Sequence, residues 1–392
     1  MHLDLTAEQH SLRKQLRSYY RDLFTPELRA ALNAEWDDMG GSVFRQIVAR
    51  MGADGWLGIG WPKEYGGQGR GPLEQLIFWE ETYRARAPLP IIAVNTIGPT
   101  VIRYGTDEQK QALLPGILRG ELHFGVGYTE PSAGTDLASL TTRAVRDGDE
   151  YVINGSKVYT SLADFSDYIW LAARTNADAP KHRGISIFMV STRLPGFKLT
   201  PIQTMGGVRT NATYYEDMRV PASCLIGKEN EGWSLIVNQL NHERVSLSPH
   251  GSIEHLFQEA RAWTQETKLA DGRRVIDQPF VQANLAKVHA KLEVLKLMNW
   301  KQAWSMTRGS LHPAEASATK VFATEFYVEA YRLLLELFGA RGTLRPGSSD
   351  AVLRGRVERM YRTTLILTFG GGTNEVQREI IAAAGLQMPR GR

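Results

Sequence analysis

The sequence predicts an α+β protein in which a helical segment, a β segment and a second helical segment follow one another. The spacing of apolar residues is helical up to about residue 120, alternating to about residue 232, and helical again beyond that. The 392 residues, of which 43% are hydrophobic and 22% charged, suffice for two or three folded units. We expect an N-terminal α-helical domain over residues 1–120, a central β domain over 121–232 and a C-terminal α-helical bundle over 233–392.

Composition excludes several functional classes. The 46 Lys and Arg against 42 Asp and Glu give a net charge of +4 without a basic run, so we expect no nucleic-acid partner. Cys224 is the only cysteine and can form neither an intramolecular disulfide nor a cysteine zinc site, so we expect a reducing compartment and no bound metal. The sequence shows no signal-peptide pattern and no apolar run of about 18 residues, so we expect a cytoplasmic protein without membrane segments.

The N-terminal segment shows helical spacing with two breaks. Apolar residues from Leu12 to Leu23 recur at helical intervals, and Thr25-Pro26 is typical of one helix ending and the next beginning. The stretch from Gly58 to Gly71 is too rich in glycine and proline for a helix, so we expect an ordered loop there. Helical spacing resumes over residues 73–81 and 109–118.

Turn signals follow one another closely in the central segment. They are Asp147-Gly148, Asn154-Gly155 and Leu194-Pro195-Gly196. Asn-Gly between alternating stretches is the strongest short hairpin signal, because both residues tolerate positive φ. We therefore expect a type I′ hairpin at Asn154-Gly155, within a β segment that ends near Gly227.

The C-terminal segment is expected to consist of long helices separated by glycines. They cover residues 279–306, 314–338 and 353–367. An earlier helix begins near Trp233, and Glu243 lies on or beside its apolar stripe. A carboxylate is unusual on a helix face that only packs.

Three further segments exceed what packing requires. They are residues 125–140 (GVGYTEPSAGTDLASL), 153–173 (INGSKVYTSLADFSDYIWLAA) and 367–382 (LTFGGGTNEVQREIIA). The first offers backbone N–H groups and hydroxyls to a planar or anionic ligand, and Thr373 is expected to cap a helix in the third. Each segment taken alone is equally well explained as an ordinary loop, strand or helix break.

Five motifs occur together and in order: WPKEYGGQG, YTEPSAGTD, INGSKVYTS followed by YIWLAART, ERV on a helix, and GGGTNEVQREIIA. This combination, which covers residues 5–386, resembles the acyl-CoA dehydrogenase family. The stretches NQLNHERV, KHRGIS and LRGRVERM are most similar to the alpha-type subunit of actinobacterial heteromeric enzymes that act on steroid side-chain CoA thioesters in cholesterol catabolism.

The resemblance implies the acyl-CoA dehydrogenase fold, with an N-terminal helical domain, a central β-barrel-like domain and a C-terminal four-helix bundle. It implies FAD-dependent α,β-dehydrogenation of a bulky, 2-methyl-branched steroid side-chain acyl-CoA, as in β-oxidation, with electrons passed to an electron-transfer flavoprotein. Two alternatives remain open: a non-catalytic or scaffolding subunit of such a complex, and a flavin monooxygenase or oxidase on the same fold.

The resemblance offers two positions for the catalytic base. Many members carry it directly before the Gly-Thr of the last motif, where this sequence has Gly371. A minority carry it before an arginine on the first long C-terminal helix, which Glu243 and Arg244 match. We expect Glu243 to be the base, with its pKa raised by burial, and the alternative is a structural ion pair of Glu243.

The same resemblance implies the remaining residues of the substrate and FAD sites. Substrate contacts are expected from Arg244, Asn241, Thr135 and the backbone N–H of Gly371. FAD contacts are expected from Val126, Tyr128, Thr129, Thr135, Tyr159, Ser161, Thr373 and Glu375.

Two positions depart from homotetrameric members, in which a neighbouring subunit binds the flavin diphosphate and adenosine. Gly272 stands where those members have an arginine, and Glu336 where they have a glutamine. A carboxylate beside a diphosphate is repulsive. We therefore expect one subunit of an α2β2 heterotetramer with a paralogous chain and one FAD per heterodimer.

Overall fold

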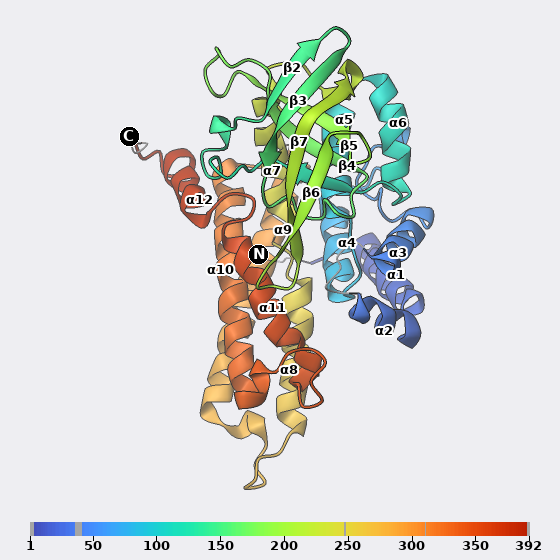
Figure 1. Cartoon of the computed structure of the whole chain (residues 1–392). Helices are drawn as coiled ribbons and strands as arrows, with labels where there is room; N and C mark the ends of the chain where they lie inside the picture. Colours follow the sequence, from blue (N-terminus) through green and yellow to red (C-terminus); the bar gives the residue numbers. More distant parts are fainter. Residues whose placement is uncertain (1–3, 36–40, 247, 310, 390–392) are drawn as a thin grey trace.

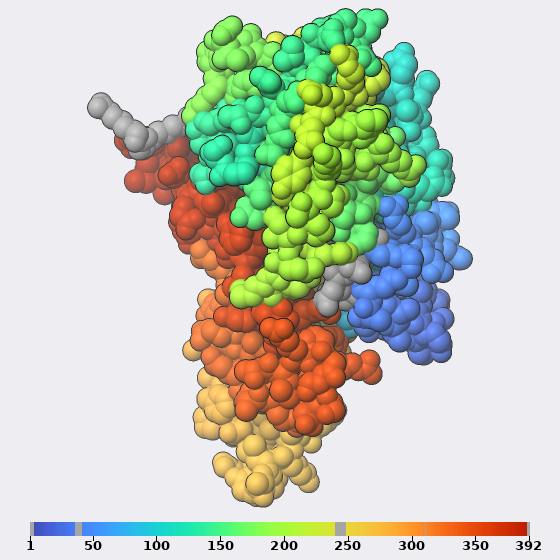
Figure 2. Space-filling view, viewed as in Figure 1, coloured from blue at the N-terminus to red at the C-terminus, as the bar shows by residue number. Residues whose placement is uncertain are grey.

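The structure, a computed structural model, describes residues 4–35, 41–246, 248–309 and 311–389, and for residues 240–246 it describes the backbone alone. Figure 1 shows helices beside a twisted sheet, with long C-terminal helices extending beyond both. In Figure 2 the central part, in green, rests on the N-terminal helices, in blue, and on the C-terminal segments, in red. The expected order of helices, strands and helices is confirmed.

The N-terminal part consists of short helices. They are α1 (Ala7–Leu23), α2 (Pro26–Ala34), α3 (Ser42–Ala53), α4 (Pro72–Arg84), α5 (Gly98–Tyr104) and α6 (Asp107–Leu118), with a π-helix η2 (Ile92–Ile97) before α5. Thr6 and Thr106 each form a capping box with the glutamine three positions later, and Thr25 caps α2 before Pro26. The ordered loop expected over residues 58–71 is confirmed, with one short 3₁₀ turn in it, η1 (Lys63–Tyr65).

The strands of the central part belong to one sheet. They are β1 (Phe124–Gly127), β2 (Arg143–Asp147), β3 (Glu150–Lys157), β4 (Tyr168–Arg174), β5 (Ile185–Ser191), β6 (Phe197–Gln203), β7 (Arg209–Pro221) and β8 (Leu225–Ile226). Their order across the sheet is β6-β7-β3-β2-β4-β5-β8, and β1 pairs with β4 in parallel. This parallel pair places the start of the 125–140 segment beside the end of the 153–173 segment.

The hairpin expected at Asn154-Gly155 is wrong. β3 runs through both residues, and Asn154 pairs with Arg143 of β2. Gly155 lies where the pairing of β3 with β7 shifts register; its φ is +149°, and a Cβ there would meet Thr142 at 2.6 Å. The turn between β2 and β3 instead contains Gly148, so the Asn-Gly pair marks a bulge and the Asp-Gly pair marks the turn.

The C-terminal part consists mainly of long helices. They are α7 (Gly232–Ser246), α8 (Gly251–Glu266), α9 (Pro279–Thr307), α10 (Pro313–Leu337), α11 (Arg356–Thr364) and α12 (Asn374–Ile380). The helices expected over 279–306 and 314–338 are confirmed by α9 and α10. The helix expected over 353–367 is shorter, because Leu353 and Arg354 have positive φ and α11 begins only at Arg356.

Helix α7 lies where the parts meet. Leu235 and Ile236 of α7 are buried in a core that also contains Trp170 of β4 and Phe78 of α4. A separate core lies among α8, α9 and α10. None of the described helices combines the length and the hydropathy needed to span a bilayer.

Candidate active site

The end of β1 lies against the segment that follows β3. Val158 N donates to Thr129 O at 2.8 Å, and the buried Lys157 Nζ donates to Tyr128 O at 3.1 Å. These two contacts hold side by side the segments that the sequence pattern assigns to the flavin ring.

Tyr159 presents an exposed aromatic ring in this arrangement. Its φ is +60°, and the residue is 64% exposed. Contacts hold this uncommon backbone: Thr160 N donates to Asn211 O at 2.9 Å, and Asn211 Nδ2 donates back to Thr160 O at 3.1 Å. Ser161 Oγ lies 3.2 Å from Thr210 Oγ1. A ring and a hydroxyl on a fixed backbone fit a flat aromatic ligand.

A buried hydrogen-bond network joins α7 to the sheet at this place. Tyr128 Oη donates to Gln239 Oε1 at 2.5 Å, and Trp170 Nε1 donates to the same oxygen at 3.0 Å. Gln239 Nε2 is a buried donor without an acceptor among the described residues. Because buried amides are normally satisfied, this donor fits a site where a bound ligand supplies an acceptor.

Glu130 and Lys157 form a buried ion pair next to Tyr128. Lys157 Nζ lies 2.8 Å from Glu130 Oε1, and the two side chains are 0% and 2% exposed. Glu130 also accepts from Thr141 N at 2.7 Å and from Thr142 N at 2.8 Å. Burial raises the pKa of Glu130, but the charge of Lys157 and these hydrogen bonds outweigh burial and lower the pKa to about 2.

The lowered pKa of Glu130 means that the stability of the folded protein at acid pH tests the Glu130–Lys157 ion pair. Because the pKa of Glu130 is lower in the folded protein than its ordinary value of 4.5, the stability it contributes is present above pH 4.5 and is lost as pH falls toward about 2. We expect the melting temperature of the wild type to fall more steeply below about pH 4.5 than that of the double variant Glu130→Gln/Lys157→Met, which lacks the titrating carboxylate. Calorimetry over this interval checks it, and equal slopes would contradict it.

A buried lysine of α10 holds the glycine-rich loop before α12. Lys320 Nζ donates to Gly372 O and to Asn374 Oδ1, both at 2.8 Å, and the lysine is fully buried. Gly371 has a φ of +68°, in the left-handed region that favours glycine. The predicted N-cap is confirmed, because Thr373 Oγ1 accepts a backbone N–H of the first turn at 3.2 Å.

Replacing Lys320 by methionine is expected to loosen this loop. The buried Asn374 Oδ1 and the partly buried Gly372 O each lose a donor, and Asn374 Oδ1 keeps only the longer contact with Thr324 Oγ1 at 3.3 Å among the described residues. A group left unsatisfied costs about 1–3 kcal/mol. We expect a lower melting temperature and less flavin per chain, both read from the purified protein. The matched control is Lys301→Met on α9, whose side chain is 63% exposed and pairs with Glu315 at 2.8 Å. Similar effects of the two substitutions would contradict the role of Lys320.

Two predicted contacts are exposed side chains, Thr135 and Glu375. No hydrogen bond within the described part of the chain connects either of them to the segments around Tyr159. The structure thus brings together Val126, Tyr128 and Thr129 with Tyr159 and Ser161, and the assignments of Thr135 and Glu375 stay predictions.

The predicted base lies on the last turns of α7. The backbone of Asn241, Glu243 and Arg244 is helical, and their side chains lie outside the described residues. Glu243 follows Gln239 by four positions, so its Cα lies about one helical turn further along the same face of α7. The contact of Gln239 with Tyr128 turns this face toward the end of β1.

A buried polar cluster fixes the chain just after α7. Glu80 Oε1 of α4 lies 2.9 Å from His250 Nδ1 and accepts from His250 N at 3.2 Å. Asn299 Nδ2 of α9 donates to Ser248 O at 2.8 Å. Helix α7 is therefore held on both sides of Glu243, by the sheet at Gln239 and by α4 and α9 after its last turn.

Gln239, Lys157 and Lys320 contact the site segments but are not among the residues expected from the sequence. Lys157 has the same parity in β3 as the buried Tyr151 and Ile153, so strand alternation was a usable signal for its burial. Gln239 is a polar residue within an apolar helical stripe, a weaker signal of the same kind. The contacts of Lys320 come from a loop about 50 residues later, which no local pattern predicts.

The fold and this site define a class of flavin-dependent oxidoreductase, and comparison with known proteins identifies the family. Models of the acyl-CoA dehydrogenase N-terminal, middle and C-terminal domains match residues 6–121, 125–218 and 230–386. The chain belongs to the acyl-CoA dehydrogenase family.

Individual relatives agree over the full length. Acyl-CoA dehydrogenase FadE26 of Mycobacterium tuberculosis is 55% identical over 397 residues, covering 100% of this chain and 99% of that protein. FadE29 of the same organism is 46% identical, with the same coverage. Among solved structures, the ChsE4-ChsE5 complex from Mycobacterium tuberculosis matches with a TM-score of 0.93 and 56% identity, and the Tcur3481-Tcur3483 steroid ACAD with 0.94 and 49%; each match covers 100% of both chains.

Proposed function

We propose that this acyl-CoA dehydrogenase converts a bulky, 2-methyl-branched steroid side-chain acyl-CoA to the 2-enoyl-CoA with FAD as its cofactor. The observation that carries this proposal is the hydrogen bond between Tyr128 and Gln239. It holds α7, the helix that contains Glu243, against the segments that fit a flavin ring. The steroid acyl group is supported by the similarity to a structure described as a steroid ACAD and by the missing side chain at Gly371. An electron-transfer flavoprotein is the proposed acceptor, and the single Cys224 is typical of the cytoplasm, where we place the reaction.

FAD, when bound, supplies the acceptor for the hydride that leaves the β-carbon. The residues that would hold it are Val126, Tyr128, Thr129, Tyr159 and Ser161 around the ring, with Thr135, Thr373 and Glu375 as further contacts. The exposed ring of Tyr159 and the unsatisfied Gln239 Nε2 support this assignment.

The remaining chemistry is proton transfer from the α-carbon of the thioester. An α-proton is weakly acidic, so its removal needs a positioned carboxylate and a donor to the developing enolate oxygen. We assign the carboxylate to Glu243, the donor to the backbone N–H of Gly371, and substrate positioning to Arg244 and Asn241. A base on α7 is consistent with the two-sided anchoring of this helix.

We further propose that the chain is one subunit of an α2β2 heterotetramer with a paralogous partner. Glu336 is engaged within the chain, where it accepts from Asn284 Nδ2 at 2.9 Å and from Arg332 Nη1 at 3.1 Å. Gly272 lies in an open turn with φ +83° and no atom within 4 Å of a Cβ built there. Neither position offers a cation to a neighbour's diphosphate, and two similar solved structures are named for pairs of chains.

Anaerobic mixing with a 2-methyl-branched steroid side-chain acyl-CoA tests the proposed reaction. We expect rapid bleaching of the oxidised flavin absorbance and formation of the 2-enoyl-CoA. Flavin that stays oxidised with the acyl-CoA, but that another reducing substrate reduces and oxygen then directly reoxidises, would favour a monooxygenase or oxidase instead. Flavin counted per chain after co-expression with paralogous chains tests the assembly, and a fully flavinated, active homotetramer would contradict it.

A further inference from the structure

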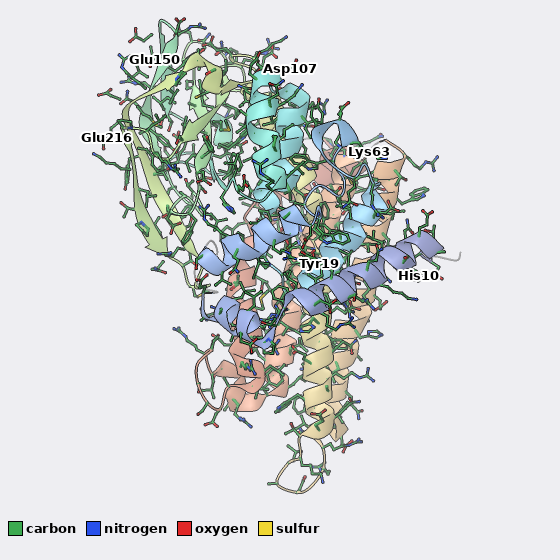
Figure 3. The ribbon with its side chains drawn as sticks, turned by 90° about the vertical axis from the view of Figure 1, so that its right-hand side faces the viewer. His10, Tyr19, Lys63, Asp107, Glu150 and Glu216 are labelled. Carbon is green, nitrogen blue, oxygen red and sulfur yellow. The ribbon has the colours of Figure 1, made fainter. Side chains whose placement is uncertain are left out.

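A large cleft lies between the N-terminal helices and the C-terminal part. Its volume is about 900 Å³, and α1, α2 and α4 face α8 and the segment from Pro346 to Arg359 across it. In Figure 3 α2 lies next to the segment that precedes α11. The lining contains eight arginines: Arg17, Arg21, Arg29, Arg84, Arg86, Arg354, Arg356 and Arg359.

Two carboxylates among the described residues of the lining pair with some of these arginines. They are Glu81 and Glu259, and each already has a partner in the lining. Glu81 accepts from Arg17 Nε and Nη2, both at 2.9 Å, and Glu259 accepts from Arg356 Nη2 at 2.7 Å. Two further arginines of the lining pair with carboxylates outside it, Arg84 with Glu254 at 2.7 Å and Arg21 with Asp22 at 3.4 Å.

Arg29 and Arg354 are two lining arginines for which the described residues provide no carboxylate partner. The guanidinium of Arg29 lies 3.6 Å from the centre of the Phe24 ring and donates to the backbone oxygen of Arg86, and no carboxylate pairs with it among the described residues. Arg354 likewise has no ion pair within the described part of the chain. Burial, and to a smaller extent the charge of Arg356, lowers the pKa of Arg29 to about 10.

The backbone on one side of the cleft has three consecutive residues in the left-handed region. Leu353, Arg354 and Gly355 follow one another with φ of +48°, +59° and +69°. A Cβ at Gly355 would lie 2.5 Å from Pro346 N, so this turn is closely packed. It places Arg354 at the cleft and starts α11 with Arg356, and the two non-glycine residues accept a strain of about 1–2 kcal/mol each.

We propose that this cleft binds an anion carrying two or more phosphate groups. A guanidinium group matches phosphate oxygens with two parallel hydrogen bonds, and several arginines converging from separate elements can share one polyanion. The volume suits a small molecule up to the size of a nucleotide. An apolar ligand would leave the charges desolvated, and a single small ion could not bridge the walls. This site is independent of the proposed dehydrogenation.

Titration calorimetry with inorganic pyrophosphate tests the proposal on the full-length, flavin-containing protein. We expect saturable binding that weakens as salt is added, as for other exposed charge contacts. Arg29→Gln and Arg354→Gln should each weaken binding about tenfold or more, the loss of one charge-assisted contact. The matched control is Arg193→Gln, which removes one positive charge at a side chain that is 85% exposed and outside the cleft lining.

The outcomes separate the possible sources of the anion. Binding of ADP tighter than pyrophosphate assigns a nucleotide, and equal binding assigns the diphosphate group alone; both support the site provided that the cleft variants weaken them. Equally tight binding of sulfate, an equal effect of Arg193→Gln, or no saturable heat with pyrophosphate would overturn the proposal. Flavin content and melting temperature of each variant confirm that it is folded, and because the readout is binding, failure of the dehydrogenase assignment would not affect it.

Discussion

Replacing Glu243 by glutamine is expected to slow flavin reduction by an acyl-CoA by about three to four orders of magnitude, the upper part of the range for a general base. Glutamine keeps the length of the side chain but cannot accept the α-proton. The residues proposed around the flavin ring are unchanged, so FAD content should stay at the wild-type level. Anaerobic stopped-flow absorbance, with flavin quantified on the same sample, measures both quantities.

The matched control is Glu231→Gln. Glu231 is an exposed carboxylate immediately before α7, so its loss changes the charge near the same helix without altering the proposed site. We expect a rate within about twofold of the wild type, since surface substitutions have small effects. A flavinated Glu243→Gln enzyme that kept more than about a tenth of the wild-type rate would place the base elsewhere.

Glu130→Gln is expected to destabilise the β part strongly. It leaves the ammonium of Lys157 buried and unpaired, which typically costs about 3–5 kcal/mol. Lys157 also holds the backbone oxygen of Tyr128 at 3.1 Å, so the end of β1 should loosen with it. We expect a clearly lower melting temperature and weaker flavin retention, measured by calorimetry and by absorbance after gel filtration.

An exposed ion pair provides the comparison. Glu216 lies on the outer side of the sheet in Figure 3 and pairs with Lys198 at 2.6 Å, with side chains 60% and 65% exposed. Glu216→Gln should change stability by less than about 1 kcal/mol. Adding Lys157→Met to Glu130→Gln should restore much of the lost stability, because an apolar pair can replace a buried ion pair. Equal effects of Glu130→Gln and Glu216→Gln would falsify the assignment.

Local signals explain which parts of the fold could be predicted. Thr25 and Thr373 cap helices where the sequence placed helix starts, because capping depends on residues within one turn. The Asn154-Gly155 hairpin failed because the same residues also suit a bulge inside a long strand, and only the pairing with β2 and β7 decides between them. The domain boundaries at residues 120 and 232 stay predictions.

The site was predictable only in part, for a physical reason. Motif order identified the segments of Tyr128 and Tyr159, and the structure brings them together. Partners far apart in sequence, such as Glu80 with His250 or Lys320 with Gly372, depend on how helices dock, which spacing does not encode. The role of Glu243 stays a prediction, and the contacts on either side of it are what make the prediction specific.

The contacts that hold α7 determine how a movement of the C-terminal helices affects the region around residue 243. The middle of the helix is bonded to the sheet through Gln239, and the chain that leaves its C-terminal end is bonded to α4 and α9. We expect a tilt of the C-terminal bundle to shift α7 against the sheet near residue 243, because contacts on both sides of that residue hold the helix. We expect substitutions at the far end of the bundle to change turnover while leaving every reacting group in place.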